Sequence, residues 1–171
     1  MKRLVNVFLI SVALMAFSLS AHAQVSATAT ASATIVTPIA IANASDMDFG
    51  NVAVSASVGT VIISPAGVRT AGGGVSLPAI AGTVTAASFD VTGTANYTYS
   101  ITLPAAATTI TNPGGDIMTV DNWTSTPTPT GTLDAGGAQT LSVGATLNVA
   151  GGQASGTYTS GTPFTVTVNY N

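Results

Sequence analysis

The C-terminal segment PFTVTVNYN, residues 163–171, carries the pattern that decides the fold. Phe164, Val166, Val168 and Tyr170 alternate with threonines and an asparagine. Because successive side chains of a β-strand point to opposite faces of its sheet, this alternation predicts a strand with one buried face. The sequence ends directly after this strand, so we expect another segment to cover its edge.

Short alternating runs recur along the rest of the sequence, and turns rich in Gly and Pro separate them. No segment shows the 3.6-residue periodicity of an amphipathic helix. A spacing of about ten residues between strands is typical of β-sandwiches, so the sequence predicts one all-β domain, an immunoglobulin-like β-sandwich. The expected strands are 38–43, 48–55, 60–65, 74–78, 87–93, 96–104, 116–123, 131–135, 139–149 and 161–171.

The alternation also predicts which side chains form the core. One face of a strand collects its large apolar residues while threonine and serine occupy the other face. The expected inward side chains are Tyr97, Tyr99, Ile101, Leu103, Phe89, Val91, Leu147 and Val149.

The N-terminus has the order of a secretory signal peptide. Lys2 and Arg3 precede an apolar stretch, which ends in the small-residue sequence AHA at Ala23. This order predicts a signal peptide over residues 1–23 and export through the inner membrane, via the periplasm, to the cell surface or the medium. No later stretch is long and apolar enough to predict a transmembrane segment in the mature chain.

The residue types left after residue 23 exclude several classes of function. One arginine, Arg69, stands against six aspartates, which gives a side-chain charge of −5, and Cys, His, Lys and Glu are all absent. Nucleic-acid binding needs clustered Lys or Arg. Cysteine and serine nucleophiles paired with histidine, and ordinary zinc or haem sites, need the missing residue types. We therefore expect no enzyme, no cofactor and no nucleic-acid partner.

The aspartates remain the only acidic groups that could support hydrolysis or bind calcium. Asp46 and Asp48 lie two residues apart in SDMDFG, where a solvated turn is the simpler interpretation. Asp116, Asp121 and Asp134 lie in or beside loops rich in Gly, Pro or Asn, without the spacing of a calcium-binding loop. We expect no metal site and no aspartate-dependent active site.

A second alternating segment, QVSATATASATIV, follows the signal peptide. Its apolar positions are separated by serine or threonine, and it contains no charge. Two interpretations remain open: a first strand or leader within its own domain, or a donor strand that completes the sheet of a neighbouring molecule. The apolar positions are Val25, Ala27, Ala29, Ala31, Ala33 and Ile35.

Three stretches together resemble a known group of exported bacterial proteins. They are TIVTPIAIANASDMDFGNVAV (34–54), AGTVTAASFDVTGTANYTYSITLP (81–104) and the segment from GTLDAGG to the terminal FTVTVNY (131–170). In this order, behind a signal peptide, they resemble the pilin-like domains of the spore-coat U and archaic chaperone-usher group. They are still more similar to a related exported family described only as a domain of unknown function.

This resemblance implies a subunit that lacks its last strand and accepts the N-terminal strand of a neighbour. The acceptor edge would be the strand with Phe164, Val166, Val168 and Tyr170, and the donor would be the alternating segment within the extension, residues 24–37. The sandwich domain would span residues 38–171. The implied partners are further copies or related subunits, with a periplasmic chaperone and an outer-membrane usher. The implied function is a structural subunit of a surface filament or coat.

The alternative interpretation is a monomeric secreted module that binds carbohydrate or a surface. Trp123, in a loop region rich in proline, is a candidate for stacking on a sugar ring, with Tyr158 as a second contact. A single Trp in a small β-sandwich is more often a core or loop anchor than a sugar platform.

Overall fold

The computed structural model describes residues 24–171, so the predicted signal peptide lies outside the described residues. Residues 24–39 form neither strand nor helix, and the compact unit spans Val36–Asn171. Within residues 24–171 the chain forms eleven strands and no helix, which confirms the all-β prediction. That part of the chain accordingly holds no helix with the length and apolar character needed to cross a membrane.

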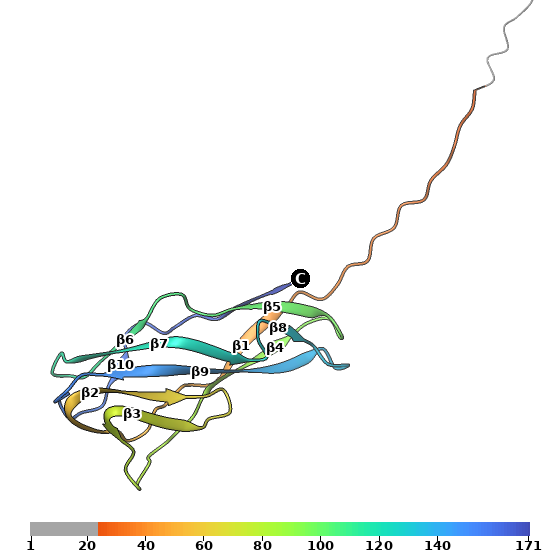
Figure 1. Cartoon of the computed structure of the whole chain (residues 1–171). Helices are drawn as coiled ribbons and strands as arrows, with labels where there is room; N and C mark the ends of the chain where they lie inside the picture. Colours follow the sequence, from red (N-terminus) through yellow and green to blue (C-terminus); the bar gives the residue numbers. More distant parts are fainter. Residues whose placement is uncertain (1–23) are drawn as a thin grey trace, which may run out of the picture. The chain divides into compact units, whose positions relative to one another are not determined.

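Turns and longer loops connect the eleven strands of the compact unit (Figure 1). They are β1 (Ala40–Ser45), β2 (Ala53–Ile63), β3 (Arg69–Ser76), β4 (Ala87–Thr92), β5 (Thr98–Thr102), β6 (Thr108–Thr111), β7 (Ile117–Thr126), β8 (Thr130–Thr132), β9 (Ala138–Val149), β10 (Thr159–Ser160) and β11 (Thr167–Tyr170).

The larger of two antiparallel sheets is organised around β9, the longest strand (Figure 1). Its order is β1-β4-β9-β7-β6-β10, with β2 on β9 and β3 on β2. β4 pairs with residues 138–143 of β9 and β2 pairs with residues 145–149, on the edge opposite β7. Gly144 lies between these two stretches, where a side chain would collide with the backbone of Ile63 and Ser64. A glycine at this position therefore lets two strands share one edge.

The smaller sheet has the order β11-β5-β8. In its antiparallel register Tyr170 of β11 lies opposite Tyr99 of β5, and Tyr99 lies opposite Gly131 of β8. β11 is therefore an edge strand.

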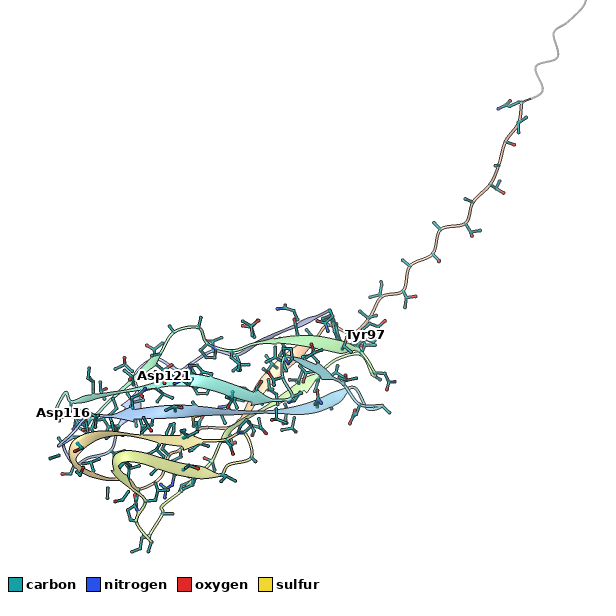
Figure 2. The ribbon with its side chains drawn as sticks, viewed as in Figure 1. Tyr97, Asp116 and Asp121 are labelled. Atoms are coloured by element: carbon teal, nitrogen blue, oxygen red, sulfur yellow. The ribbon has the colours of Figure 1, made fainter. Side chains whose placement is uncertain are left out.

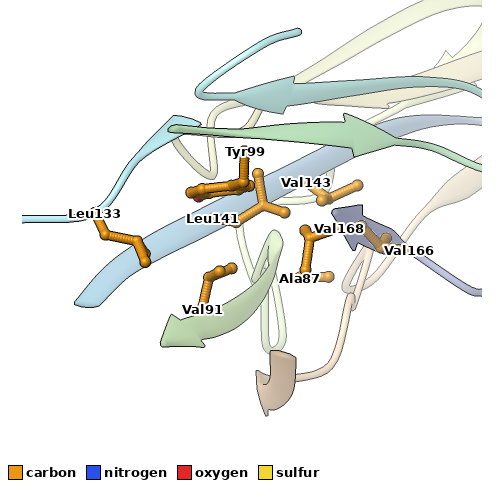
Figure 3. Packing of buried hydrophobic residues seen from close by; sticks show 8 residues of the cluster. All are labelled: Ala87, Val91, Tyr99, Leu133, Leu141, Val143, Val166 and Val168. Atoms are coloured by element: carbon orange, nitrogen blue, oxygen red, sulfur yellow. The ribbon is translucent and has the colours of Figure 1, made fainter. Parts of the chain in front are cut away.

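The main core lies between the two sheets (Figure 3). The phenol ring of Tyr99 is fully buried beside Gly131, and its hydroxyl donates a hydrogen bond of 2.8 Å to Oε1 of Gln139. The same Oε1 accepts a bond of 2.9 Å from the backbone N–H of Thr132, so the buried polar atoms of this pair are satisfied. The buried apolar members of this core are Ala87, Val91, Tyr99, Leu133, Leu141, Val143, Val166 and Val168.

A second apolar cluster continues along the inner face of the larger sheet, formed by residues of β2, β3, β7 and β9. Side chains outside the strands, Met47, Phe49, Val52 and Leu77, pack against it. Its buried members are Val61, Val75, Val120, Ala145, Leu147 and Val149.

Most of the predicted core is confirmed. Val91, Tyr99, Leu147 and Val149 are buried, and the partly buried Phe89, Ile101 and Leu103 pack against the main core. The prediction for Tyr97 was wrong, since 43% of this residue is exposed. Tyr97 precedes the first paired residue of β5, so the alternation of the strand does not extend to it.

The predicted strands differ from the observed ones mainly near bulges and in short strands. The strands expected at 48–55 and 60–65 are one strand, β2, with an irregularity between Val54 and Gly59. Asp48 instead begins a turn at Gly50, where φ is +65°. The short strands β6 and β10 were not predicted, because they contain a single large apolar residue, Ile110.

Leu141→Ala should lower the free energy of unfolding by about 2–5 kcal/mol, because it removes a fully buried side chain and leaves a cavity. Thr140→Ala, on the exposed face of the same strand, should change it by less than about 0.5 kcal/mol. Urea denaturation followed by far-UV circular dichroism measures both values. Equal losses for the two variants would contradict this description of the core.

Burial raises the pKa of the Tyr99 phenol above its ordinary value of 10.0. The folded chain then holds this proton at a pH where the unfolded chain releases it, so the stability is full below about pH 10 and falls as the pH rises further. Tyr99→Phe should flatten the fall in urea midpoint above about pH 10, whereas Thr140→Ala, which removes no ionisable group, should keep it. The same slope in both variants would contradict the assignment.

Candidate strand-acceptor site

β11 has one hydrogen-bonded neighbour, β5, in the part of the chain that the structure describes. β1, at the edge of the larger sheet, likewise pairs with β4 alone. The two edge strands contact each other although they belong to different sheets. Each of the two strands has one edge whose backbone N–H and C=O groups have no strand partner among the described residues.

The four predicted acceptor residues all reach the core side of this terminal segment. Val166 and Val168 are buried, with 7% and 6% exposed, and Phe164 and Tyr170 are partly buried against the same core. The paired part is shorter than predicted, since β11 begins at Thr167 opposite Thr102 of β5. Two residues beyond Thr102 the chain reaches a proline, which has no N–H to continue the ladder.

Three aromatic rings pack against the main core and against each other. The rings of Trp123 and Phe164 lie 4.4 Å apart between centroids at an interplanar angle of 37°. Phe89 of β4 meets Phe164 edge-on at 6.3 Å. Ile39 and Ile41, before and within β1, pack against the same core. Large side chains of the domain therefore occupy the space behind both edge strands.

A β-bulge directs Trp123 into the interior. The register of β7 on β9 shifts between Asp121 and Thr124, and Asn122 has a left-handed φ of 51°. The extra residue inverts the alternation after Val120, so Trp123 packs against both apolar clusters. Its Nε1 is buried and has no hydrogen-bond partner among the described residues. A buried N–H without an acceptor costs about 1–3 kcal/mol.

The hydroxyl of Tyr170 joins three segments at one end of β11. It accepts a hydrogen bond of 2.6 Å from the backbone N–H of Thr94 and donates one of 2.8 Å to the carbonyl of Thr37. The N–H of Thr37 in turn donates to the hydroxyl of Thr94, at 2.9 Å. Tyr97 packs edge-on against Tyr170 at 5.6 Å. This network fixes the chain three residues before β1.

The six predicted donor residues lie in a part of the chain without regular secondary structure. Residues 24–35 are separate from the compact unit, and 92% of Val25 and 97% of Ile35 are exposed. The predicted alternation is present, but the segment forms no strand. The predicted domain begins at residue 38, two residues after the start of the compact unit at Val36.

The residues proposed for carbohydrate binding have internal partners. Trp123 packs against both clusters, as a core anchor does. The Tyr158 hydroxyl accepts bonds from the amides of Gln153 and Asn112, at 2.9 and 3.2 Å, and donates to the carbonyl of Ala154 at 2.8 Å. Trp123 therefore contributes to internal packing, and the Tyr158 hydroxyl to internal hydrogen bonding.

Five of the aspartates accept hydrogen bonds from groups within four residues of them in the sequence. Asp116 and Tyr97 lie at opposite ends of the domain (Figure 2). Among the described residues no group of three or more His, Cys, Asp or Glu lies together. The bonds come from Asn43 to Asp46, from Gly50 to Asp48, from Asn112 to Asp116, from Asn122 to Asp121, and from Gly136 and Ala138 to Asp134.

Two functional features were not predicted from the sequence. The first is the contact of Tyr170 with Thr37, for which the only signal is a tyrosine close to the end of an alternating strand. The second is the inward position of Trp123, which depends on a bulge at Asn122. A residue such as Asn, which tolerates φ > 0, is a weak sign of such a bulge.

The model of one protein family matches most of the chain. It is the domain of unknown function DUF4402, and the match covers residues 39–170. The chain therefore belongs to this family. No curated protein and no solved structure matches it.

Tyr170→Phe should free the backbone N–H of Thr94 and detach Thr37 from β11, because it removes the hydroxyl that bonds both residues, while the bond between Thr37 and Thr94 remains. We expect faster amide hydrogen exchange at Thr94 and a loss of about 1 kcal/mol in stability. Tyr97→Phe is the control, since it keeps the aromatic contact with Tyr170. Unchanged protection at Thr94 in the Tyr170 variant would contradict the proposed role of the hydroxyl.

Proposed function

We propose that this chain is an exported structural subunit of a cell-surface filament or coat, assembled head to tail by β-strand donation. In this proposal the domain is a pilin-like, immunoglobulin-like sandwich that lacks one strand. A segment within residues 24–36 of a neighbouring copy supplies it. Related subunits are further partners, and a periplasmic chaperone and an outer-membrane usher are the proposed assembly factors.

The observation that carries the proposal is the unpaired edge of β11. Its residues turn an apolar side to the core, and its other edge has no strand partner among the described residues. Strand addition to such an edge gains main-chain hydrogen bonds, and alternate side chains of the added strand enter the interior. The domain has one cation, Arg69, whose guanidinium donates to the carbonyls of Phe49 and Asn51, away from β11. No lysine protects the edge against association, so covering it is advantageous.

The topology supports donation from a neighbour over pairing within one chain. The Tyr170 hydroxyl holds Thr37 at the C-terminal end of β11. If the extension of the same chain folded back along β11, its last residue would lie at the C-terminal end of β11. The two segments would then run in the same direction, so they would pair in parallel orientation. Parallel pairing is slightly less stable per residue than antiparallel pairing. A strand from another molecule has no such constraint and can pair antiparallel.

Donation between identical copies also determines the type of assembly. The donor segment and the acceptor edge are different surfaces of the same chain, so each contact leaves one free donor and one free edge. Heterologous contacts of this kind build open filaments unless the rotation closes a ring. A filament is thus the expected product.

Deletion of residues 24–35 should leave a folded monomer, because the compact unit begins at Val36. A chain that begins at residue 24 should instead form filaments and a gel ladder that collapses only on boiling. Light scattering and negative-stain microscopy distinguish the two. If the longer chain is a monomer at every concentration, the proposed function is overturned and a monomeric binding module is favoured instead.

The orientation of the donor is tested by moving it. Residues 24–36, appended through a short glycine linker after Asn171 of the shortened chain, should fold back antiparallel to β11. We expect a monomer with a higher melting temperature than the shortened chain, since the edge is covered. The same segment with its residue order scrambled is the control. Equal melting temperatures for the two fusions would contradict strand addition at β11.

A further inference from the structure

Resting on the proposed function, we propose that the extension also sets the spacing between subunits, and that it places two opposite ends of the domain in contact. The root end of one copy, formed by Thr37, Tyr97 and Tyr170, then lies against the turn end of the next copy. The turn end is formed by Tyr158 and the turn at residues 112–116. The partner of each surface is therefore a second copy of this chain.

The root end is where the extension leaves the domain. The Tyr170 hydroxyl donates a hydrogen bond of 2.8 Å to the carbonyl of Thr37, so the preceding residue, Val36, is held beside the C-terminal end of β11. The ring of Tyr97 packs edge-on against that of Tyr170 at 5.6 Å, and 43% of Tyr97 is exposed. An exposed tyrosine therefore lies beside the point from which the extension departs.

The turn end lies at the other end of the domain, between β6 and β7. Its Asp116 and the Tyr97 of the root end lie at opposite ends in Figure 2. Nδ2 of Asn112 donates a hydrogen bond of 3.2 Å to the hydroxyl of Tyr158, which ties the chain before β10 to this turn. Residues 158–170 therefore run from the turn end to the root end.

The extension and this terminal segment have the same length. Residues 24–36 and residues 158–170 contain 13 residues each. At about 3.3 Å per residue, an extended strand of that length spans about 43 Å. A strand that is added antiparallel to β11 begins beside Tyr170 and, extended over the whole terminal segment, ends beside Tyr158. The last residue of the donor therefore arrives at the turn end of the acceptor.

The position of this last residue decides which surfaces meet. Val36 of the donor copy is followed directly by Thr37, which belongs to the root end of that copy. The root end of the donor copy therefore faces the turn end of the acceptor. With parallel pairing the last donor residue would lie beside Tyr170, and two root ends would meet instead. The two orientations thus predict different contacts between domains.

The chemistry of the two ends suits this contact. Pro113, Gly114 and Gly115 of the turn are exposed, uncharged and without long side chains, so an aromatic ring can approach their backbone closely. The adjacent carboxylate of Asp116 can accept a hydrogen bond from a phenol hydroxyl. Tyr97 supplies an apolar ring and such a hydroxyl on one exposed side chain, a residue type that is enriched at protein interfaces.

Thiols placed on both ends test the contact, because the sequence contains no cysteine. Chains that begin at residue 24 carry Tyr97→Cys and Gly114→Cys together, or either substitution alone. The closest contacts of a side chain at residue 114 are with side-chain atoms of Asn112 and Asp116, at 3.3 and 3.4 Å. Filaments of each chain, checked by negative-stain microscopy, are treated with a short bismaleimide and analysed on denaturing gels after boiling.

We expect a covalent ladder from the double variant and monomers from each single variant. Linked dimers from Tyr97→Cys alone mean that two root ends meet, which overturns the proposal. Filaments of the double variant without a ladder mean that the ends lie apart, which also overturns it while the proposed function stands. If Tyr97→Cys prevents assembly, Asn171→Cys takes its place, since Asn171 follows Tyr170 at the same end and leaves both tyrosines intact.

The role of the extension as a spacer is tested by lengthening it in the double variant. Two residues, Thr-Ala, inserted between Val36 and Thr37 should move the two ends about 7 Å apart and abolish the ladder. The same two residues added before Gln24, at the outer end of the extension, are the matched control and should preserve it. Equal ladders from both chains overturn the spacing role. Failure of the unsubstituted chain to assemble overturns the proposed function and this proposal together.

Discussion

The open edge of β11 is the constraint from which the proposed assembly follows. On one side the backbone of β11 is hydrogen-bonded to β5, and its apolar side chains pack in the core. On the other side its backbone groups have no strand partner in the described domain. Water can satisfy these groups, so the single domain is stable. An unprotected apolar edge is nevertheless a template for another strand. Selection on such a surface favours one defined partner over many undefined ones.

The sequence predicts the strands well where alternation is regular and long. β4, β5 and β9 lie close to their expected positions, and their inward residues Val91, Tyr99 and Leu147 are buried. Alternation fails where the backbone departs from it. The bulge at Asn122 turns Trp123 inward, and Tyr97 lies just before the first paired residue of its strand. Such departures depend on contacts between distant strands, which no local pattern records.

Only the β11 side of the candidate site was predictable from the sequence. The alternation of the terminal strand places Val166 and Val168 on the core side, as the structure has them. The other rim, β1, and its contact with β11 follow from the topology of two sheets, and the sequence contains no signal for it. The hydrogen bond between Tyr170 and Thr37 joins residues 133 positions apart, a distance at which single-sequence reasoning has no information.

The division of large and small side chains between domain and extension has a physical reason of its own. In a free chain the extension is exposed, and a row of leucines there would be an aggregation-prone segment without a nearby charge. Alanines reduce that hazard, although each buries little apolar area. The domain carries its own large side chains, and the rings of Trp123, Phe164 and Phe89 pack together in the single chain. In the proposed assembly, main-chain hydrogen bonds along β11 supply the affinity, and the alternate side chains of the added strand supply the specificity.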